Sequence, residues 1–88
     1  MGKLDGKVAL ITGSGRGIGQ SLAFQLANEG ARLVINDLDA EPANETVAAI
    51  KSKGGEAVAC VGSVTAPDFA DRFIRTAMDN FRGIDIIV

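Results

Sequence analysis

The stretch ITGSGRGIGQ, residues 11–20, places four glycines at alternate positions: Gly13, Gly15, Gly17 and Gly19. Glycine inside a helix or strand costs roughly 0.5–1 kcal/mol relative to alanine, so such a cluster indicates either a turn that only glycine can make or the close approach of a ligand. The apolar run VALIT (8–12) precedes the cluster, and apolar residues recur every four positions after it, at Ile18, Leu22 and Leu26. This pattern predicts a strand, a glycine-rich turn and a helix over 17–29.

Three further apolar runs repeat the alternation: RLVIND (32–37), AVACV (57–61) and IDIIV (84–88). Apolar strands separated by helices predict a doubly wound α/β fold, with a parallel sheet covered on both faces. The intervening segments predict two more helices. One starts near Asp39, whose side chain can cap it, and ends at Gly54 and Gly55; the other opens at 65–68, with Thr65 as its cap, and runs to Gly83. Their expected core stripes are Ala43, Val47 and Ile50 in the first, and Phe69, Phe73, Ala77 and Phe81 in the second.

Composition excludes several classes of function. A chain of 88 residues holds one domain at most, and a formal net charge of −2 offers no electrostatic footprint for nucleic acid. No apolar run approaches the ~20 residues that span a bilayer, and the start lacks a cleavable secretory pattern, so we expect a cytoplasmic protein without membrane contact. Cys60 is the only cysteine and histidine is absent, so we expect no disulfide and no metal site, and Cys60 is interpreted as a small buried apolar residue.

The expected junction between strand and helix suits an anion. A helix start carries unpaired N–H groups and about half a positive charge, and missing side chains let a phosphate come close to them. The alternative is a tight turn without a ligand. The fingerprint G-x-G-x-x-G does not fit, because starting at Gly13 or Gly15 it requires glycine at Ile18 or Gln20, and the P-loop ending is also absent.

The spacing that does fit is T-G-x-x-x-G-x-G, formed by Thr12, Gly13, Gly17 and Gly19, and it resembles the cofactor loop of the short-chain dehydrogenase/reductase family. The segments LDGKVALITG, EGARLVINDLD and GIDIIV also resemble the amino-terminal half of that family. The resemblance implies a Rossmann-type sheet of four strands in the order 3-2-1-4 with three helices, binding NAD or NADP. It further implies that residues 1–88 are the amino-terminal dinucleotide-binding portion of a single-domain oxidoreductase.

The same resemblance implies roles for the loop. Gly13 makes the turn, Gly17 and Gly19 allow approach of the pyrophosphate, and residues 14–18 supply contacts to the cofactor: Ser14, Gly15, Arg16, Gly17 and Ile18. Arg16 is expected over a cofactor phosphate, or else as an ordinary solvated arginine. Thr12 is expected to hold the loop to neighbouring backbone.

Three further positions bear on the choice of cofactor. Asp37 lies where doubly wound folds place the acid that receives the adenosine ribose hydroxyls. A carboxylate there repels a 2′-phosphate, and Leu38 stands where NADP-preferring relatives often carry a basic residue. NAD is therefore favoured over NADP. An arginine in the loop, such as Arg16, often accompanies NADP in the family and argues for the opposite choice. Ser63, where the family commonly has aspartate, and Val64 are expected beside the adenine.

Hydride transfer in this family uses a tyrosine, a lysine four residues later and a serine, and this chain contains no tyrosine. We therefore expect an oxidoreductase parent, homo-oligomeric, that interconverts an alcohol and a carbonyl compound, with 3-oxoacyl thioester reductase and 3-hydroxyacyl dehydrogenase as candidates. The 88 residues alone are expected to bind cofactor and oxidise nothing, with no catalytic residue among them. The alternative is a noncatalytic dinucleotide-binding module.

Overall fold

The computed structural model describes residues 2–88, in which strands and helices alternate along the chain. The bounds of the elements are β1 Val8–Ile11, α1 Gly17–Asn28, β2 Arg32–Asp37, α2 Ala40–Ser52, β3 Glu56–Val61, α3 Phe69–Phe81 and β4 Ile86–Ile87. The apolar runs therefore form strands as predicted, although β1 ends one residue before Thr12 and β4 is limited to two residues.

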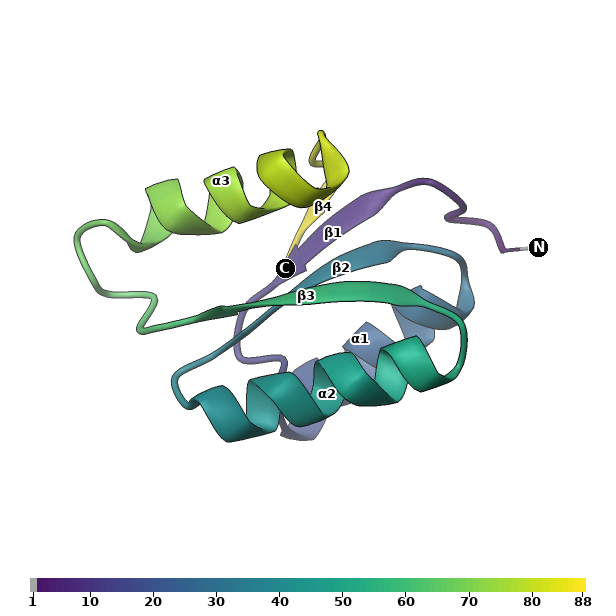
Figure 1. The fold of residues 1–88 in the computed structure, drawn as a ribbon, viewed down its shortest axis with the longest axis horizontal. Helices are drawn as coiled ribbons and strands as arrows, with labels where there is room; N and C mark the ends of the chain where they lie inside the picture. Colours follow the sequence, from purple (N-terminus) through teal and green to yellow (C-terminus); the bar gives the residue numbers. More distant parts are fainter. Residues whose placement is uncertain (1) are drawn as a thin grey trace.

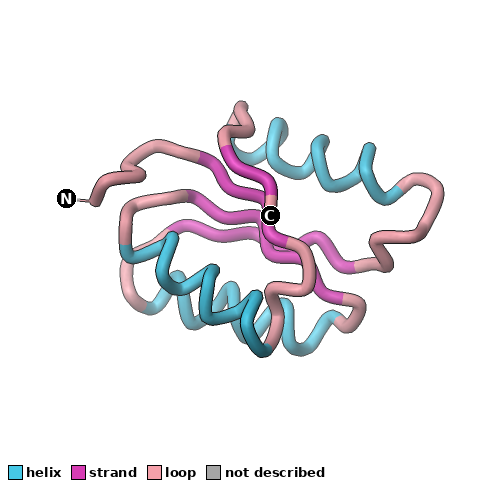
Figure 2. The backbone as a smooth tube through the Cα atoms, turned by 180° about the vertical axis from the view of Figure 1, so that it is seen from behind, coloured by secondary structure: helices cyan, strands magenta, loops and turns pink. Residues whose placement is uncertain are grey.

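The four strands form one parallel sheet in the order β3-β2-β1-β4. Both the α/β class and the predicted strand order are confirmed. Helices α1 and α2 cover one face of the sheet and α3 covers the other (Figure 1), and the view from behind shows the same layers (Figure 2). Because all strands run in one direction, the loops that follow β1, β2 and β3 meet at the same edge of the sheet.

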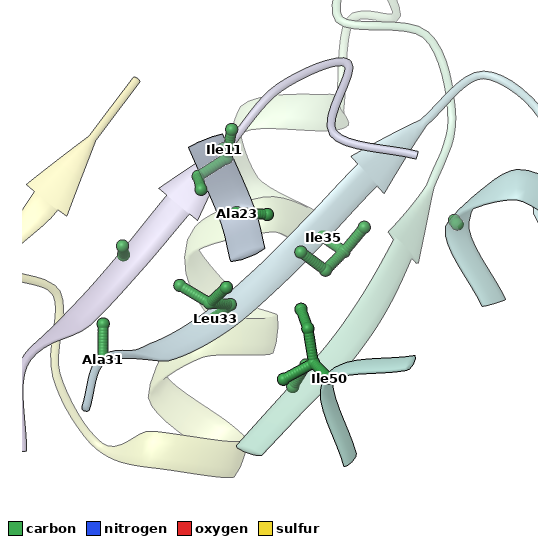
Figure 3. Close-up of a cluster of buried hydrophobic side chains, with 9 residues drawn as sticks. Ile11, Ala23, Ala31, Leu33, Ile35 and Ile50 are labelled. Carbon is green, nitrogen blue, oxygen red and sulfur yellow. The ribbon is translucent and has the colours of Figure 1, made fainter. Parts of the chain in front are cut away.

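The core beneath α1 and α2 consists of alternate residues of the strands. Ile11, Leu33 and Ile35 project from β1 and β2 toward Ala23 of α1 and Ile50 of α2 (Figure 3). All five side chains are at most 2 % exposed. Burial of such side chains stabilises a fold by roughly 1.5–3 kcal/mol for each Leu or Ile, so this face anchors the loops described below.

The opposite face is packed by α3. Phe69, Phe73 and Ala77 of α3 are buried against Val34 and Cys60, and Phe81 is partly buried at the end of the same stripe. This confirms the predicted stripe and the apolar role of Cys60, whose side chain belongs to the core of this face.

The three apolar residues whose spacing predicted α1 are not equally buried. Ile18 is 89 % exposed, whereas Ala23 is fully buried and Leu22 and Leu26 are half-buried. The reason is the close approach of the first helical turn to the preceding loop, which occurs at Gly19 rather than at Ile18. Phe24, which is not one of these three, packs partly buried against the same core, with the Lys53 ammonium 5.3 Å from its ring centroid.

The predicted helix caps are also corrected. Asp39 precedes α2 but makes no side-chain hydrogen bond to it, because its carboxylate is bonded to Arg16 instead. Helix α3 begins at Phe69 rather than at 65–68, and the Thr65 hydroxyl lies 2.7 Å from that of Ser63. The left-handed residue that ends α3 is Arg82 (φ 60°), one position before the predicted Gly83. Within residues 2–88, no helix is long and apolar enough to span a membrane.

Candidate functional site

A pocket of about 590 Å³ opens where the loops after β1, β2 and β3 meet. These loops lie toward the left of Figure 1. Ten residues from the end of β2 and from these three loops line the pocket: Thr12, Gly13, Arg16, Asn36, Asp37, Leu38, Asp39, Gly62, Ser63 and Val64. The pocket therefore unites the candidate phosphate loop, the candidate ribose acid and the candidate adenine residues, which are far apart in the sequence.

The glycine-rich loop requires glycine for two reasons. Gly13 and Gly17 have φ of 59° and 62°, a left-handed conformation that disfavours other side chains. A Cβ at Gly19 would collide with the Gly13 carbonyl oxygen, and a Cβ at Gly15 would lie 2.6 Å from Asp37 Oδ2. The loop is consequently folded back on the start of α1 on one side and packed against Asp37 on the other.

The first turn of α1 has no counter-charge of its own. Arg16 stands at the N-cap with extended backbone and makes no side-chain hydrogen bond to the helix, and the first turn holds no acidic residue. The unpaired N–H groups and the partial positive charge of a helix start are therefore open to an anion at this end of α1.

Asn36 connects the ends of β1, β2 and β3. Its side chain, in a residue only 2 % exposed, donates to the carbonyls of Cys60 (3.0 Å) and Gly62 (3.1 Å), and its Oδ1 accepts from the Gly13 N–H (3.1 Å). The sequence prediction missed Asn36. The available signal was an uncharged polar residue inside an apolar strand covered on both faces, since such a buried group needs hydrogen-bond partners.

Ser14 lies behind the loop rather than in the pocket. It is fully buried, its hydroxyl donates to the Ile11 carbonyl (2.7 Å) and accepts from the Asn36 N–H (3.0 Å), and its own N–H donates to the Asn36 carbonyl (2.6 Å). These bonds tie the loop to β2. A cofactor contact by Ser14 stays a prediction, and the geometry gives this side chain a supporting position.

A second support comes from α2. The Thr46 hydroxyl, which is fully buried, donates to the Gly15 carbonyl (3.1 Å) and accepts from Gln20 Nε2 (3.1 Å). Thr12 also holds the loop from the β4 side, because its N–H and hydroxyl both lie within 3.2 Å of the Val88 carbonyl. This agrees with the role expected for Thr12.

Asp37 is nearly buried, with its side chain 6 % exposed, and is paired with Arg16. Arg16 Nη2 lies 3.0 Å from Asp37 Oδ1, and Arg16 Nε lies 3.4 Å from Asp37 Oδ2. The same Nη2 lies 2.8 Å from Asp39 Oδ2. The hydrogen bond that Arg16 donates holds the pKa of Asp37 below its usual value, and the acceptance of its N–H groups by the two carboxylates raises the pKa of Arg16.

The remaining predicted residues frame the pocket or flank it. Leu38 and Val64 are exposed apolar side chains on its wall, 67 % and 56 % exposed, and the Ser63 hydroxyl accepts from the Thr65 N–H (3.2 Å). The structure thus brings six predicted residues into the pocket: Gly13, Arg16, Asp37, Leu38, Ser63 and Val64. Gly15, Gly17, Ile18 and Gly19 belong to the adjoining loop and helix start, and Asn36, Asp39 and Gly62 join the site without having been predicted in it.

A doubly wound parallel sheet with a glycine-rich loop after its first strand and an acid at the end of its second defines the Rossmann type of fold. The family model for the short chain dehydrogenases matches residues 7–88. The chain belongs to this family, whose members are oxidoreductases that bind nicotinamide dinucleotides.

Similar proteins agree on the family. The chain is 46 % identical over 86 residues to a probable tetrahydroxynaphthalene reductase of Zymoseptoria tritici, covering 97 % of this chain and 32 % of the relative. A short chain dehydrogenase from Mycobacterium avium superposes with a TM-score of 0.93 at 39 % identity, covering 99 % of this chain and 33 % of that one. A 7α-hydroxysteroid dehydrogenase solved with NADH and 7-oxo glycochenodeoxycholic acid superposes with a TM-score of 0.92 at 38 % identity, covering 96 % of this chain and 33 % of that one. The chain spans about a third of the length of these relatives.

Proposed function

We propose that this chain binds the adenosine and pyrophosphate end of NAD, as the cofactor-binding portion of an oxidoreductase that interconverts an alcohol and a carbonyl compound. The observation that carries the proposal is the position of Asp37, a nearly buried carboxylate in the pocket wall that touches the glycine-rich loop. A ribose acceptor and an open helix start thus lie next to each other, which is the arrangement that a dinucleotide requires.

Each part of the pocket suits a part of the cofactor. The open start of α1 suits the pyrophosphate, the carboxylate of Asp37 suits the ribose hydroxyls, and Ser63 and Val64 offer a polar and an apolar surface for the adenine. When bound, the nicotinamide supplies the position that gives or takes a hydride. The residues of this chain bind and orient the cofactor, and no tyrosine is present to exchange a proton with a substrate oxygen.

The choice of NAD over NADP rests on charge. A 2′-phosphate placed at the ribose would meet the carboxylate of Asp37, and Leu38 next to it offers no positive charge. A lowered pKa keeps Asp37 ionised at neutral pH, which supports the repulsion. Arg16 is the one cation in the pocket wall within residues 2–88, and it is engaged by two carboxylates.

The substrate class is an alcohol and its carbonyl partner, with 3-oxoacyl and 3-hydroxyacyl thioesters as candidates. The named relatives include a reductase of a hydroxynaphthalene and a dehydrogenase of a hydroxysteroid, which are chemically different substrates for similar cofactor domains. The second candidate function is a noncatalytic dinucleotide-binding module, which the same pocket supports, because binding of a dinucleotide needs only the glycine-rich loop and Asp37.

Two measurements on the purified chain test the proposal. In an NMR titration with NAD, we expect amide shifts confined to residues 12–19, 37–39 and 62–64, while Gly54 and Gly55 between α2 and β3 serve as internal controls. In a fluorescence assay for NADH over a panel of alcohols, we expect no turnover. Shifts centred elsewhere, or none at millimolar NAD, would refute the binding site, and turnover by rigorously purified chain would refute the assignment of roles.

A further inference from the structure

Asp39 stands in the pocket wall without a role in the proposed binding of NAD. It precedes α2, where an aspartate ordinarily accepts hydrogen bonds from the first helical turn, yet it caps nothing. Its carboxylate instead lies 2.8 Å from Arg16 Nη2, with the Asp39 side chain 64 % exposed. Asp39 therefore bonds to Arg16, 23 positions away in the sequence, instead of to the N–H groups at the start of α2.

Arg16 is held by the carboxylates of Asp37 and Asp39 together. Its guanidinium lies against both oxygens of Asp37, at 3.0 and 3.4 Å, and those are the oxygens that a ribose diol would use. The same guanidinium is the group that a 2′-phosphate would attract, because arginine binds phosphate through paired N–H groups. The position of Arg16 therefore bears on the binding of both kinds of nucleotide.

Asp39 helps to hold the Arg16 guanidinium beside the carboxylate of Asp37. With Arg16 and Asp37 it forms a trio of one net negative charge, and replacing it with asparagine would make the trio neutral. The loss of Asp39 would remove one of the two charged partners that hold Arg16 and one charge that repels a phosphate.

We propose that Asp39 is a specificity-determining residue, which discriminates against nucleotides with a 2′-phosphate by holding Arg16 against Asp37. This inference rests on the proposed function, because it concerns the adenosine end of the same pocket. Asp39 acts through Arg16 and through its own charge, and it need not touch the nucleotide.

Binding of 5′-AMP and of adenosine 2′,5′-bisphosphate to the chain tests this, since the two ligands differ only in the 2′-phosphate. In Asp39→Asn, we expect the affinity ratio to move toward the bisphosphate by about twofold to fivefold, the range for one exposed ion pair. The change should diminish at high salt, because exposed charges are screened. Glu41→Gln is the matched control: Glu41 is an exposed acid in the first turn of α2, outside the pocket wall, and we expect less than a twofold change.

A second background separates the role of Arg16 from a general effect of charge. In Arg16→Gln, the further substitution Asp39→Asn should alter the ratio less than it does in the unmodified chain, because only the repulsion by the Asp39 charge is then removed. Equal changes in Asp39→Asn and Glu41→Gln, or an undiminished effect in the Arg16→Gln background, would overturn the inference. If the unmodified chain binds 5′-AMP while Asp39→Asn leaves the ratio unchanged, the inference fails and the proposed function stands; if no variant binds either ligand, both fail.

Discussion

Asn36→Ala should loosen the candidate site and lower the stability of the chain together. The substitution removes three hydrogen bonds, to the Cys60 carbonyl, the Gly62 carbonyl and the Gly13 N–H, at 3.0, 3.1 and 3.1 Å. At about 1 kcal/mol net for each bond, we expect a loss of about 3 kcal/mol in the free energy of unfolding. Native domains typically have a free energy of unfolding of roughly 5–15 kcal/mol, so the loss is a large fraction of it and easy to detect.

Urea unfolding followed by circular dichroism measures this loss, and titration with 5′-AMP measures its effect on the site. We expect weaker binding as well, because the Gly13 N–H loses the contact that fixes the start of the loop. Asn80→Ala is the control: Asn80 makes one exposed bond, to the Thr76 carbonyl within α3, and its loss should alter stability by no more than about 0.5 kcal/mol.

Asn36→Asp sharpens the experiment. The carboxylate could still accept from Gly13, but its second oxygen would face the carbonyls of Cys60 and Gly62 without a proton to donate. We therefore expect a greater loss than in Asn36→Ala at neutral pH, partly recovered as the pH falls and the new carboxyl is protonated. A loss below about 0.5 kcal/mol in Asn36→Ala, with 5′-AMP binding unchanged, would refute the view that Asn36 organises the site.

Three further results are expected. Gly19→Ala should destabilise the chain and abolish nucleotide binding, since its Cβ would meet the Gly13 carbonyl, whereas Gly83→Ala, with open space around it, should be harmless in both assays. The unmodified chain should have a greater free energy of unfolding than Asp37→Asn, because Arg16 lowers the pKa of Asp37 in the folded chain. This difference should be greatest above pH 3.8, the ordinary pKa, and should decline as the pH falls below it. A pH-independent difference in urea unfolding would contradict this. The chain should self-associate through the outer edge of β4, because β4 pairs only with β1 among the described strands. Sedimentation should then show concentration-dependent association, which Ile87→Lys reduces more than Ile74→Lys does. A monomer at all concentrations would contradict this.

Those features of the fold that depend on apolar runs could be predicted from the sequence. The strand Arg32–Asp37 has the predicted bounds, because a strand buried on both faces must be apolar along nearly its whole length. Helix caps could not be predicted in the same way. Asp39 satisfies the local rule for a cap, but an arginine brought close by the tertiary fold competes for its carboxylate, and the local rule has no information about that arginine.

The candidate site was predictable to the same extent. Glycine spacing and the acid at the end of the second strand pointed to Gly13 and Asp37, and both residues line the one pocket. Asn36 and Thr46 were missed because their contribution consists of hydrogen bonds to loop backbone that only the folded chain brings within reach. The spacing of Ile18, Leu22 and Leu26 indicated the helix but not how far each side chain is buried, and Ile18 is 89 % exposed.

The way in which Asn36 joins the three strand ends has a consequence for the order of events in folding. Asn36 holds the Gly13 loop from 22 and 23 residues away in the chain, and Asn36 is itself bonded to carbonyls 24 and 26 residues further on, so the loop can acquire its shape only after β2 and β3 have docked. An adenosine nucleotide that recognises this loop would bind fully folded chains and not partly folded ones. Its concentration would then set the fraction of chains that are native, adding about 2.7 kcal/mol of stability at a hundredfold excess over its Kd.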